Sequence, residues 1–195
     1  DSITQDATDG DQVNVCSAAK QTLSGSLDLS TYGTPAEAYP LVLRGYTSAA
    51  NDGGQGEIDC NGNGMWASEY DYITMRDLKI YSDHDGTLIA LDDYNHIIHC
   101  ELYNPSSASD YIVDVDRYSS VAHCYMHNAN TASAMIHLGY YSHASYNYLD
   151  CGTGVTRGIW IVGGNSRVCH NIVSMNKTSA TGVAATAGGF YEVYG

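Results

Sequence analysis

Two stretches of this chain, Asp92-Asp-Tyr-Asn-His-Ile-Ile-His-Cys-Glu-Leu-Tyr103 and Asp116-Arg-Tyr-Ser-Ser-Val-Ala-His-Cys-Tyr-Met-His127, are copies of one pattern. The pattern returns every 23 or 24 residues over the region from Tyr70 to about Asn176. The same place in successive copies is marked by Tyr70, Tyr94, Tyr118, Tyr141 and Asn165. A fixed period of this length predicts a solenoid, in which each coil buries its apolar edge against its neighbours.

The apolar positions within each copy indicate what the coils are made of. Pairs spaced by two, as on one face of a strand, lie five and three residues before each marker: Met65/Ala67, Ile89/Leu91, Val113/Val115, Ile136/Leu138 and Trp160/Val162. Other apolar or small residues lie three residues after it (Ile73, Ile97, Val121, Ala144, Val168) and eight residues after it (Leu78, Leu102, Met126, Leu149, Val173). Because these two positions are an odd number apart, the chain must bend between them. Each coil is therefore predicted to consist of short strands joined by turns.

The bends and the first strand carry a resemblance to a known superfamily. Asn147 and Asn171 lie at the bend, the latter within Val168-Cys-His-Asn-Ile-Val-Ser-Met-Asn176, and a glycine ends the early strand Pro40-Leu-Val-Leu-Arg-Gly-Tyr46. These stretches resemble the coils of right-handed, pectate-lyase-like β-helix proteins. The resemblance implies an all-β fold, a right-handed single-stranded parallel β-helix with about 24 residues per coil. That superfamily includes polysaccharide lyases, glycoside hydrolases, and phage tailspike and virion proteins, so it does not by itself imply one activity.

The chain is predicted to form a single domain over residues 1–195. Residues 1–30 are expected to supply an N-terminal cap and the first strands, because an uncovered first coil would expose core and strand edges. Residues 40–180 are expected to form the regular coils. Residues 181–195 are expected to form the C-terminal edge, where small residues replace Leu and Ile.

The charge balance limits the partners that the chain can bind. Only 15% of residues are charged, yet the net charge is −14, with eight Lys and Arg in total. So few basic residues disfavour nucleic acid and anionic membrane surfaces as partners, and the sequence lacks the long apolar run of a membrane-inserted helix. The acidity is typical of a protein on a virion surface or in the extracellular space. Seventeen Tyr against one Phe predict many rings on the surface, with their hydroxyls in water.

Two of the six cysteines, Cys100 and Cys124, hold the same position in neighbouring copies. Stacked coils lie about 4.8 Å apart, which is close enough for a disulfide. The alternative is a ladder of buried free thiols at the bend, which Asn147 and Asn171 continue. The sequence leaves the pairing of the six cysteines open.

One predicted outward face carries aromatic and histidine side chains over three coils. Its members are Tyr103, Tyr125, Tyr148, His123 and His127. Rings in a row on a flat sheet suit stacking on sugar rings or contact with another protein. The alternative is that the ladder only stabilises the sheet.

A second outward face is acidic. It carries Asp92, Asp114, Asp116 and His137, with Asp93 and Arg117 beside it. Asp92 and Asp116 are expected to stack on neighbouring coils, which is unfavourable unless water screens them or a cation bridges them, and oxygen-only clusters suit Ca²⁺. In the lyases that the chain resembles, Ca²⁺ acidifies a sugar proton that an Arg or Lys removes, which implies that role for Arg117. In the hydrolases of that fold paired Asp residues act as acid and base, and a solvated acidic face without function is the alternative.

The few coils and short turns favour a module without a walled cleft. We therefore expect a non-catalytic structural or recognition module of a phage particle or cell exterior, forming an oligomer or part of a larger assembly. Its partners would be other protein subunits or surface polysaccharide. The alternative is a Ca²⁺-dependent polysaccharide lyase or a glycoside hydrolase that uses Asp92, Asp114, Asp116 and Arg117.

Overall fold

The computed structural model describes residues 12–17, 20–29, 36–38, 40–50, 52–67, 71–128, 130–177, 179–186 and 191–194. Part of the expected N-terminal cap, residues 1–11, lies outside the described residues. No helix among the described residues is long and apolar enough to cross a membrane.

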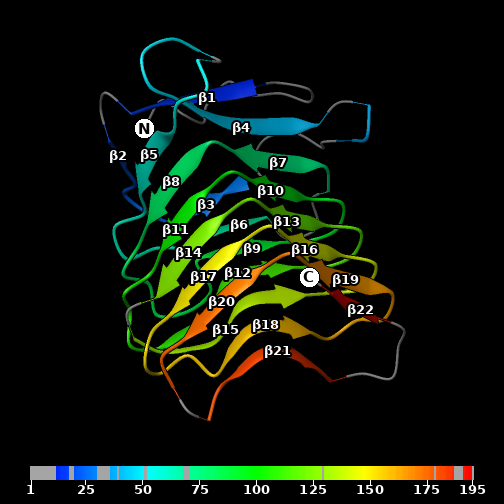
Figure 1. Ribbon diagram of the computed structural model, residues 1–195. Coiled ribbons are helices and arrows are strands. Elements are labelled where there is room, and N and C mark those ends of the chain that lie inside the picture. The colour runs from blue at the N-terminus through cyan, green and yellow to red at the C-terminus, as the bar shows by residue number, and fades with distance from the viewer. Residues whose placement is uncertain are drawn as a thin grey trace.

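The described residues form three parallel sheets of eight, seven and seven strands (Figure 1). Sheet A consists of β1 (Gln12–Cys16), β4 (Leu41–Tyr46), β7 (Ile73–Arg76), β10 (His96–Ile98), β13 (Ser120–Ala122), β16 (His143–Ser145), β19 (Ser166–Cys169) and β22 (Tyr191–Tyr194). Sheet B consists of β2 (Gln21–Thr22), β5 (Gly56–Asp59), β8 (Leu78–Tyr81), β11 (Glu101–Tyr103), β14 (Tyr125–Asn128), β17 (Tyr148–Cys151) and β20 (Ile172–Met175). Sheet C consists of β3 (Leu27–Asp28), β6 (Met65–Ala67), β9 (Ile89–Leu91), β12 (Ser109–Val115), β15 (Ala132–Leu138), β18 (Arg157–Ile161) and β21 (Thr181–Ala185).

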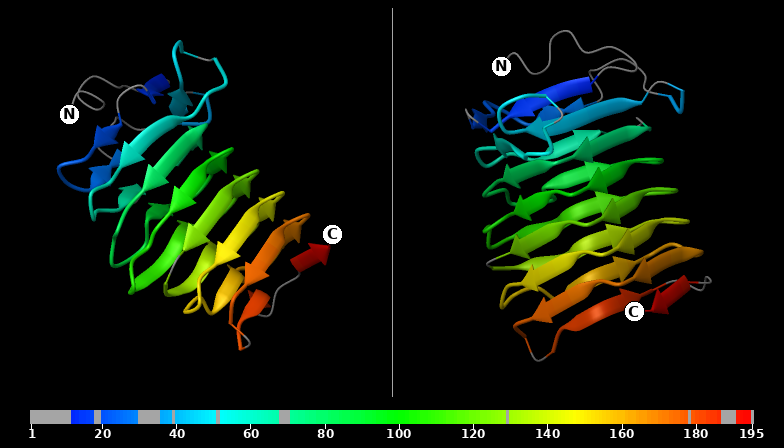
Figure 2. Two further views of the ribbon diagram at one scale, coloured as in Figure 1. Left: turned by 60° about the vertical axis from the view of Figure 1, so that its left-hand side comes forward. Right: turned by 45° about the horizontal axis from the view of Figure 1, so that its top comes forward.

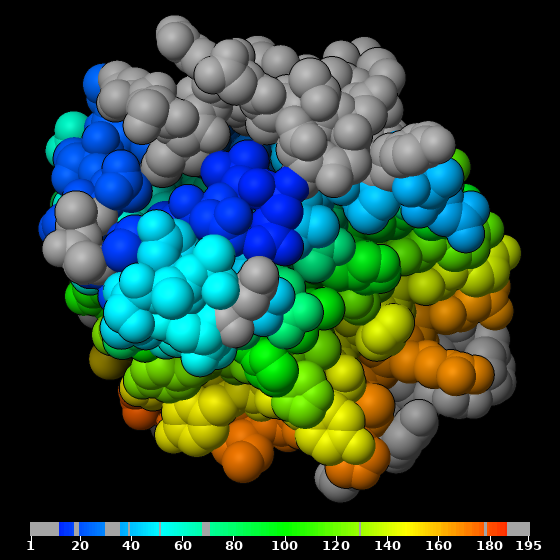
Figure 3. All heavy atoms as spheres, turned by 90° about the horizontal axis from the view of Figure 1, so that it is seen from above, coloured from blue at the N-terminus to red at the C-terminus, as the bar shows by residue number. Residues whose placement is uncertain are grey.

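The chain runs from sheet C to sheet A to sheet B and then enters the next coil (Figure 2). Leu102 pairs with Met126, and Met126 with Leu149, so one coil takes 24 and the next 23 residues. The predicted parallel β-helix is confirmed. The strands β1 and β22 lie at opposite ends of sheet A, and in the space-filling view the blue and cyan N-terminal segments lie over the later coils (Figure 3).

The core is a set of rows that run along the solenoid, with one residue from each coil in each row. Ile97 and Val121 belong to the row of sheet A, and Leu102 and Met126 belong to that of sheet B. All four side chains have an exposed fraction of 0%. Each coil is too thin to bury these residues alone, so stacking of the coils provides the hydrophobic stabilisation.

The repeat register predicted from the sequence is wrong in its first copy. The expected marker, Tyr70, lies outside the described residues, and Tyr72 holds the position equivalent to Tyr94. Met75 pairs with Ile97 and Ile80 pairs with Leu102, in place of the expected Ile73 and Leu78. The corner in this coil is two residues longer than in the next coil. The alternation of residues within the flanking strands does not reveal an insertion between them, so the predicted register was shifted by two residues.

The register is also wrong in the last predicted copy. Trp160 pairs with the outward His137, while Ile159 and Ile161 pair with the inward Ile136 and Leu138. Ile159 and Ile161 are therefore the buried pair, in place of the expected Trp160 and Val162. One additional residue between Ile161 and Asn165 produced the error, and a shift by one residue exchanges the two faces of a strand.

Two corners of each regular coil have the left-handed backbone conformation without glycine. The corner between sheets C and A has φ of 62°, 56°, 55° and 58° at Tyr72, Tyr94, Tyr118 and Tyr141. Their rings form a continuous stack with centroid separations of 5.0, 4.8 and 4.9 Å. A left-handed residue costs roughly 1–2 kcal/mol, and a stacked aromatic pair returns about 0.5–1.5 kcal/mol, so the stack offsets much of the strain.

The corner between sheets A and B repeats this arrangement. Asp77, His99, His123, Tyr146 and His170 have φ between 52° and 56°. His123 stacks on Tyr146 at 4.9 Å, and Tyr146 stacks on His170 at 4.8 Å. These histidines point into solvent. Asp77 forms ion pairs with Arg76 at 2.9 Å and Arg44 at 3.3 Å.

Below that corner lies a buried ladder that satisfies the backbone of the bend. Cys100 and Cys124 are buried free thiols, and no disulfide joins them. Asn147 continues the ladder: its Oδ1 accepts from the Cys124 amide at 2.9 Å, and its Nδ2 donates to the carbonyl of Val121 at 2.9 Å. Asn171 accepts in turn from the amide and side chain of Asn147, both at 2.9 Å.

We predict that Asn147→Ala lowers the free energy of unfolding by about 2–4 kcal/mol, because it leaves the buried Cys124 amide and Val121 carbonyl without this partner. Asn14→Ala is the matched control, since Asn14 is exposed, and we expect a change within about 0.5 kcal/mol. Urea unfolding followed by circular dichroism measures both variants. Equal midpoints for the two variants would contradict the structural role of this ladder.

Candidate functional site

The outward face of sheet C carries acidic, aromatic and small side chains in one row. The row crosses seven strands in register and consists of Asp28, Trp66, Ala90, Asp114, His137, Trp160 and Ala184. Strand periodicity turns these residues outward because their neighbours along each strand, such as Val113 and Val115, are buried. The small side chain of Ala90 leaves space between Trp66 and Asp114.

A groove of about 400 Å³ lies over the part of this row from Trp66 to His137, and Trp160 is not among its lining residues. Trp66, with 38% of its surface exposed, lies at one end of the groove. The polar lining is provided by Asp92, Asp114, Asp116 and His137. The groove therefore combines an exposed indole with carboxylates, which is the mixture of apolar surface and a few directed polar groups found in ligand sites.

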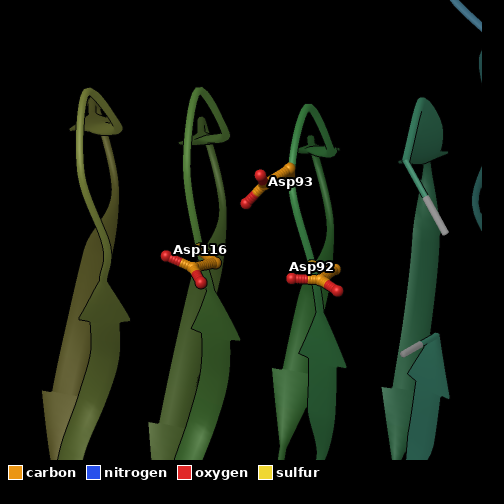
Figure 4. A group of neighbouring side chains, drawn as sticks. All are labelled: Asp92, Asp93 and Asp116. Carbon is orange, nitrogen blue, oxygen red and sulfur yellow. The ribbon is translucent and has the colours of Figure 1, made fainter. Parts of the chain in front are cut away.

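Three carboxylates gather where sheet C turns toward sheet A. Asp92, Asp93 and Asp116 have oxygen atoms that all lie within 4.8 Å of one another. Figure 4 shows Asp92 and Asp116 on neighbouring coils, with Asp93 directed into the space between those coils. Carboxylate oxygens are the ligands that Ca²⁺ prefers, so these three residues can hold such a cation with water completing its coordination.

The backbone beneath the carboxylates is held by a buried serine ladder. Ser119 Oγ donates to the carbonyl of Asp92 at 3.2 Å, and Ser142 Oγ donates to the carbonyl of Asp116. Gly139, in the coil that follows Asp116, leaves room for the carboxylate of Asp116. A Cβ at Gly139 would lie 2.3 Å from Oδ1 of Asp116, so any side chain there would displace the carboxylate.

The crowding of carboxylates affects their ionisation. Partial burial raises the pKa of Asp116, and the negative charges of Asp93, Asp92 and Asp114 raise it further, whereas Arg117 lowers it. Burial also raises the pKa of Asp71, together with the charges of Asp93 and Asp92. Both shifts favour the protonated carboxyl, so this region holds protons to a higher pH than an isolated Asp does.

At the other side of the groove, an aromatic cluster packs around His137. His137 Nδ1 donates to Asp114 Oδ1 at 2.7 Å. The ring of Tyr111 stacks on His137 with a centroid separation of 4.5 Å, and Trp160 meets His137 edge-on at 5.1 Å. Arg157 lies over Trp160 at 4.3 Å. These contacts restrict the histidine to one orientation, so its hydrogen bond to Asp114 is preorganised.

The structure brings together most of the acidic residues that the sequence singled out. Asp92, Asp114 and Asp116 line one groove. Arg117 is not among the residues that line it, and its guanidinium lies 5.9 Å from the ring centroid of Tyr140. Sequence reasoning missed Trp66 as a site residue. The period-two pattern of β6 marks Trp66 as outward between Met65 and Ala67 and was the available signal.

The predicted aromatic face lies on sheet B, away from this groove. Tyr103, Tyr125, His127 and Tyr148 point outward from three successive strands, whereas His123 lies at the corner between sheets A and B. Tyr103 and His127 stack at 3.9 Å. The stacking shows that the face is ordered, and it is compatible with sheet stabilisation as well as with binding.

We predict that Asp116→Asn stabilises the protein at pH 7 by less than about 1 kcal/mol, because the carboxylate is partly open to water that screens its repulsion. The raised pKa means that Asp116 contributes stability while protonated, below the unfolded value of 3.8, and loses it as the pH rises through the folded value. The gain should therefore vanish well below pH 3.8. Thermal unfolding across this pH range measures it, with Asp110→Asn as the control for an exposed carboxylate on β12, the strand that ends directly before Asp116. A stability gain that is independent of pH would contradict this explanation.

Comparison with known proteins gives no relative from which a role could be transferred: no protein-family model, curated protein or solved structure matches this chain.

Proposed function

We propose that this protein is a recognition module that binds a glycan along the outward face of sheet C. The observation that carries the proposal is the groove in which the exposed Trp66 lies beside Asp92, Asp114 and Asp116. An indole face packs on the apolar face of a pyranose ring, and ionised carboxylates accept hydrogen bonds from its hydroxyls. The proposal keeps the non-catalytic function expected from the sequence, with a glycan as the ligand.

The length of the surface supports a chain-like ligand. Trp66 and His137 lie three strands apart in one row, and strands are spaced by about 4.8 Å, so the groove extends over roughly 14 Å along the solenoid. An extended run of sugar units can follow this row across the coils. A monosaccharide would occupy only part of it.

The charge of the groove supports one class of glycan. Among the described residues that line it, three are acidic, His137 is the one titratable nitrogen base, and there is no Lys or Arg. A polyuronate would meet like charges here, whereas an uncharged or amino-sugar glycan would not. We therefore propose a glycan without carboxylate groups as the ligand.

The proposed setting follows from composition and from the resemblance to pectate-lyase-like β-helices. A net charge of −14 with eight basic residues suits display on a phage particle or a cell exterior. In that setting the module would contact surface polysaccharide, as part of an oligomer or larger assembly.

Glycoside hydrolysis is a second candidate because of one geometric observation. Asp92 and Asp116 have carboxylate oxygens within 4.8 Å of each other. Retaining glycosidases hold their two carboxyl groups about 5–5.5 Å apart, whereas inverting enzymes need about 6.5–9.5 Å to admit a water. An upper limit of 4.8 Å lies below the separation that an inverting enzyme needs, so the pair is compatible with a retaining reaction, with one carboxyl as nucleophile and the other as acid. For a lyase, the position of Arg117 outside the groove leaves the groove without the expected base.

We predict that Trp66→Ala weakens glycan binding by about tenfold or more, because the stacking surface is removed. Affinity electrophoresis in soluble glucans, mannans, chitosan and polygalacturonate measures it. Ile172→Ala is the control, since Ile172 is exposed to 62% on sheet B and lines neither the groove nor the predicted aromatic face. Absence of retardation by every polysaccharide would overturn the proposal, and so would equal effects of the two substitutions. Binding to polygalacturonate alone, and only with Ca²⁺, would favour the lyase alternative.

The hydrolase candidate makes a separate prediction. Any release of reducing ends from these polysaccharides should fall by more than about a hundredfold in Asp92→Asn and in Asp116→Asn, because both carboxyl groups take part in the reaction. Binding of the polysaccharide should persist in both variants. No turnover by the native protein, together with binding that depends on Trp66, would leave recognition as the function.

A further inference from the structure

A second depression, of about 340 Å³, lies on the opposite side of the coil in sheet B. Its lining includes Lys20, Glu57, Lys79, Tyr81, Glu101, Tyr103 and His127. The outward rows of β5, β8, β11 and β14 provide most of these side chains. The depression shares no residue with the groove of sheet C and therefore raises a separate question.

One wall of this depression is aromatic. Tyr81 pairs in register with Tyr103, and Tyr103 pairs with His127. The rings of Tyr81 and Tyr103 lie 5.4 Å apart with an interplanar angle of 39°, and Tyr103 stacks on His127 at 3.9 Å. Tyr81 keeps 40% of its surface exposed at the open end of the row. The stack therefore holds Tyr103 in place and leaves the ring of Tyr81 available to a ligand.

The facing row is charged, with alternating sign. Glu57, Lys79 and Glu101 pair in register on successive strands, so the signs alternate along the sheet. Lys79 Nζ lies 3.0 Å from Glu101, and Lys20 Nζ lies 2.8 Å from Asp59. An anionic ligand would have to displace a carboxylate from one of these two lysines, whereas an uncharged ligand can use the remaining donors and acceptors.

We propose that this depression is a second saccharide site, specific for an uncharged pyranose. The apolar face of the sugar ring packs on Tyr81, and neighbouring hydroxyls bind the Lys79–Glu101 pair, with the ammonium donating and the carboxylate accepting. The volume is that of a small-ligand pocket, which fits a sugar unit at the end or side of a glycan. The proposal does not depend on glycan binding by sheet C.

Saturation-transfer NMR tests the site with the methyl glycosides of glucose, galactose and mannose, and with methyl glucuronide as the charged comparison. The protein carries Trp66→Ala throughout, so that sheet C contributes no stacking. We expect saturation transfer to at least one neutral glycoside and a weaker signal from the glucuronide. When Tyr81→Ala is added, the affinity for the neutral glycoside should fall by about tenfold or more. Tyr148→Ala is the matched control, because Tyr148 is exposed to 43% on the same sheet and does not line the depression.

A second variant addresses the charged wall. Glu101→Gln removes the acceptor charge but keeps the shape, and it should lower the affinity for the neutral glycoside while circular dichroism stays unchanged. The proposal is overturned if no glycoside receives saturation, or if Tyr148→Ala weakens binding as much as Tyr81→Ala. It is also overturned if Tyr81→Ala instead abolishes self-association in sedimentation velocity, which would make the face a protein interface. If the native protein binds the glycosides and Trp66→Ala alone abolishes that binding, the binding belongs to the groove of sheet C. That result would reject the site on sheet B without affecting the first proposal.

Discussion

The structure depends on one constraint: each residue of a coil lies on its equivalent in the next coil, one strand spacing away. The constraint is most demanding at the two left-handed corners, where bulky residues such as Tyr118 and His123 take a backbone conformation that glycine normally supplies. Aromatic stacking makes those corners tolerable, because flat rings separated by 4.8 to 5.0 Å match the spacing of the strands. Below the second corner, Asn147 forms hydrogen bonds to residues of the coils on both sides, Val121 and Asn171, which the same strand spacing places within reach.

The same stacking that favours aromatic and amide ladders disfavours ladders of like charge. Asp92 and Asp116 are such a pair, and the charge of Asp92 adds to burial and to the charge of Asp93 in raising the pKa of Asp116. The cost is limited because the next residue in that row is Gly139, which ends the ladder and leaves space for the carboxylate. Ala90 similarly interrupts the row between Trp66 and Asp114. The groove of sheet C thus lies where two ladders are each broken by a small residue, which is how a solenoid without long loops obtains a groove.

Sheet B resolves the charge problem in another way. Its charged row alternates in sign from Glu57 to Lys79 to Glu101, so stacking there is attractive. The outward faces of sheets B and C therefore differ in their charge pattern although one coil geometry builds both. Different ligands on the two faces are a natural consequence, because affinity and specificity come from the side chains displayed and not from the fold.

The sequence by itself determined the fold, the period and the inward rows of the middle coils, because a strand buries alternate residues and the repeat aligns them. It also brought Asp92, Asp114 and Asp116 to one face. Only the tertiary structure decided the register at both ends, where longer corners moved the outward positions to Tyr81 and Trp160, since strand periodicity does not record insertions in a corner. Only the tertiary structure decided where the grooves lie, because their depth depends on Ala90 and Gly139 lying beside larger residues from other coils, about 24 residues away in the chain.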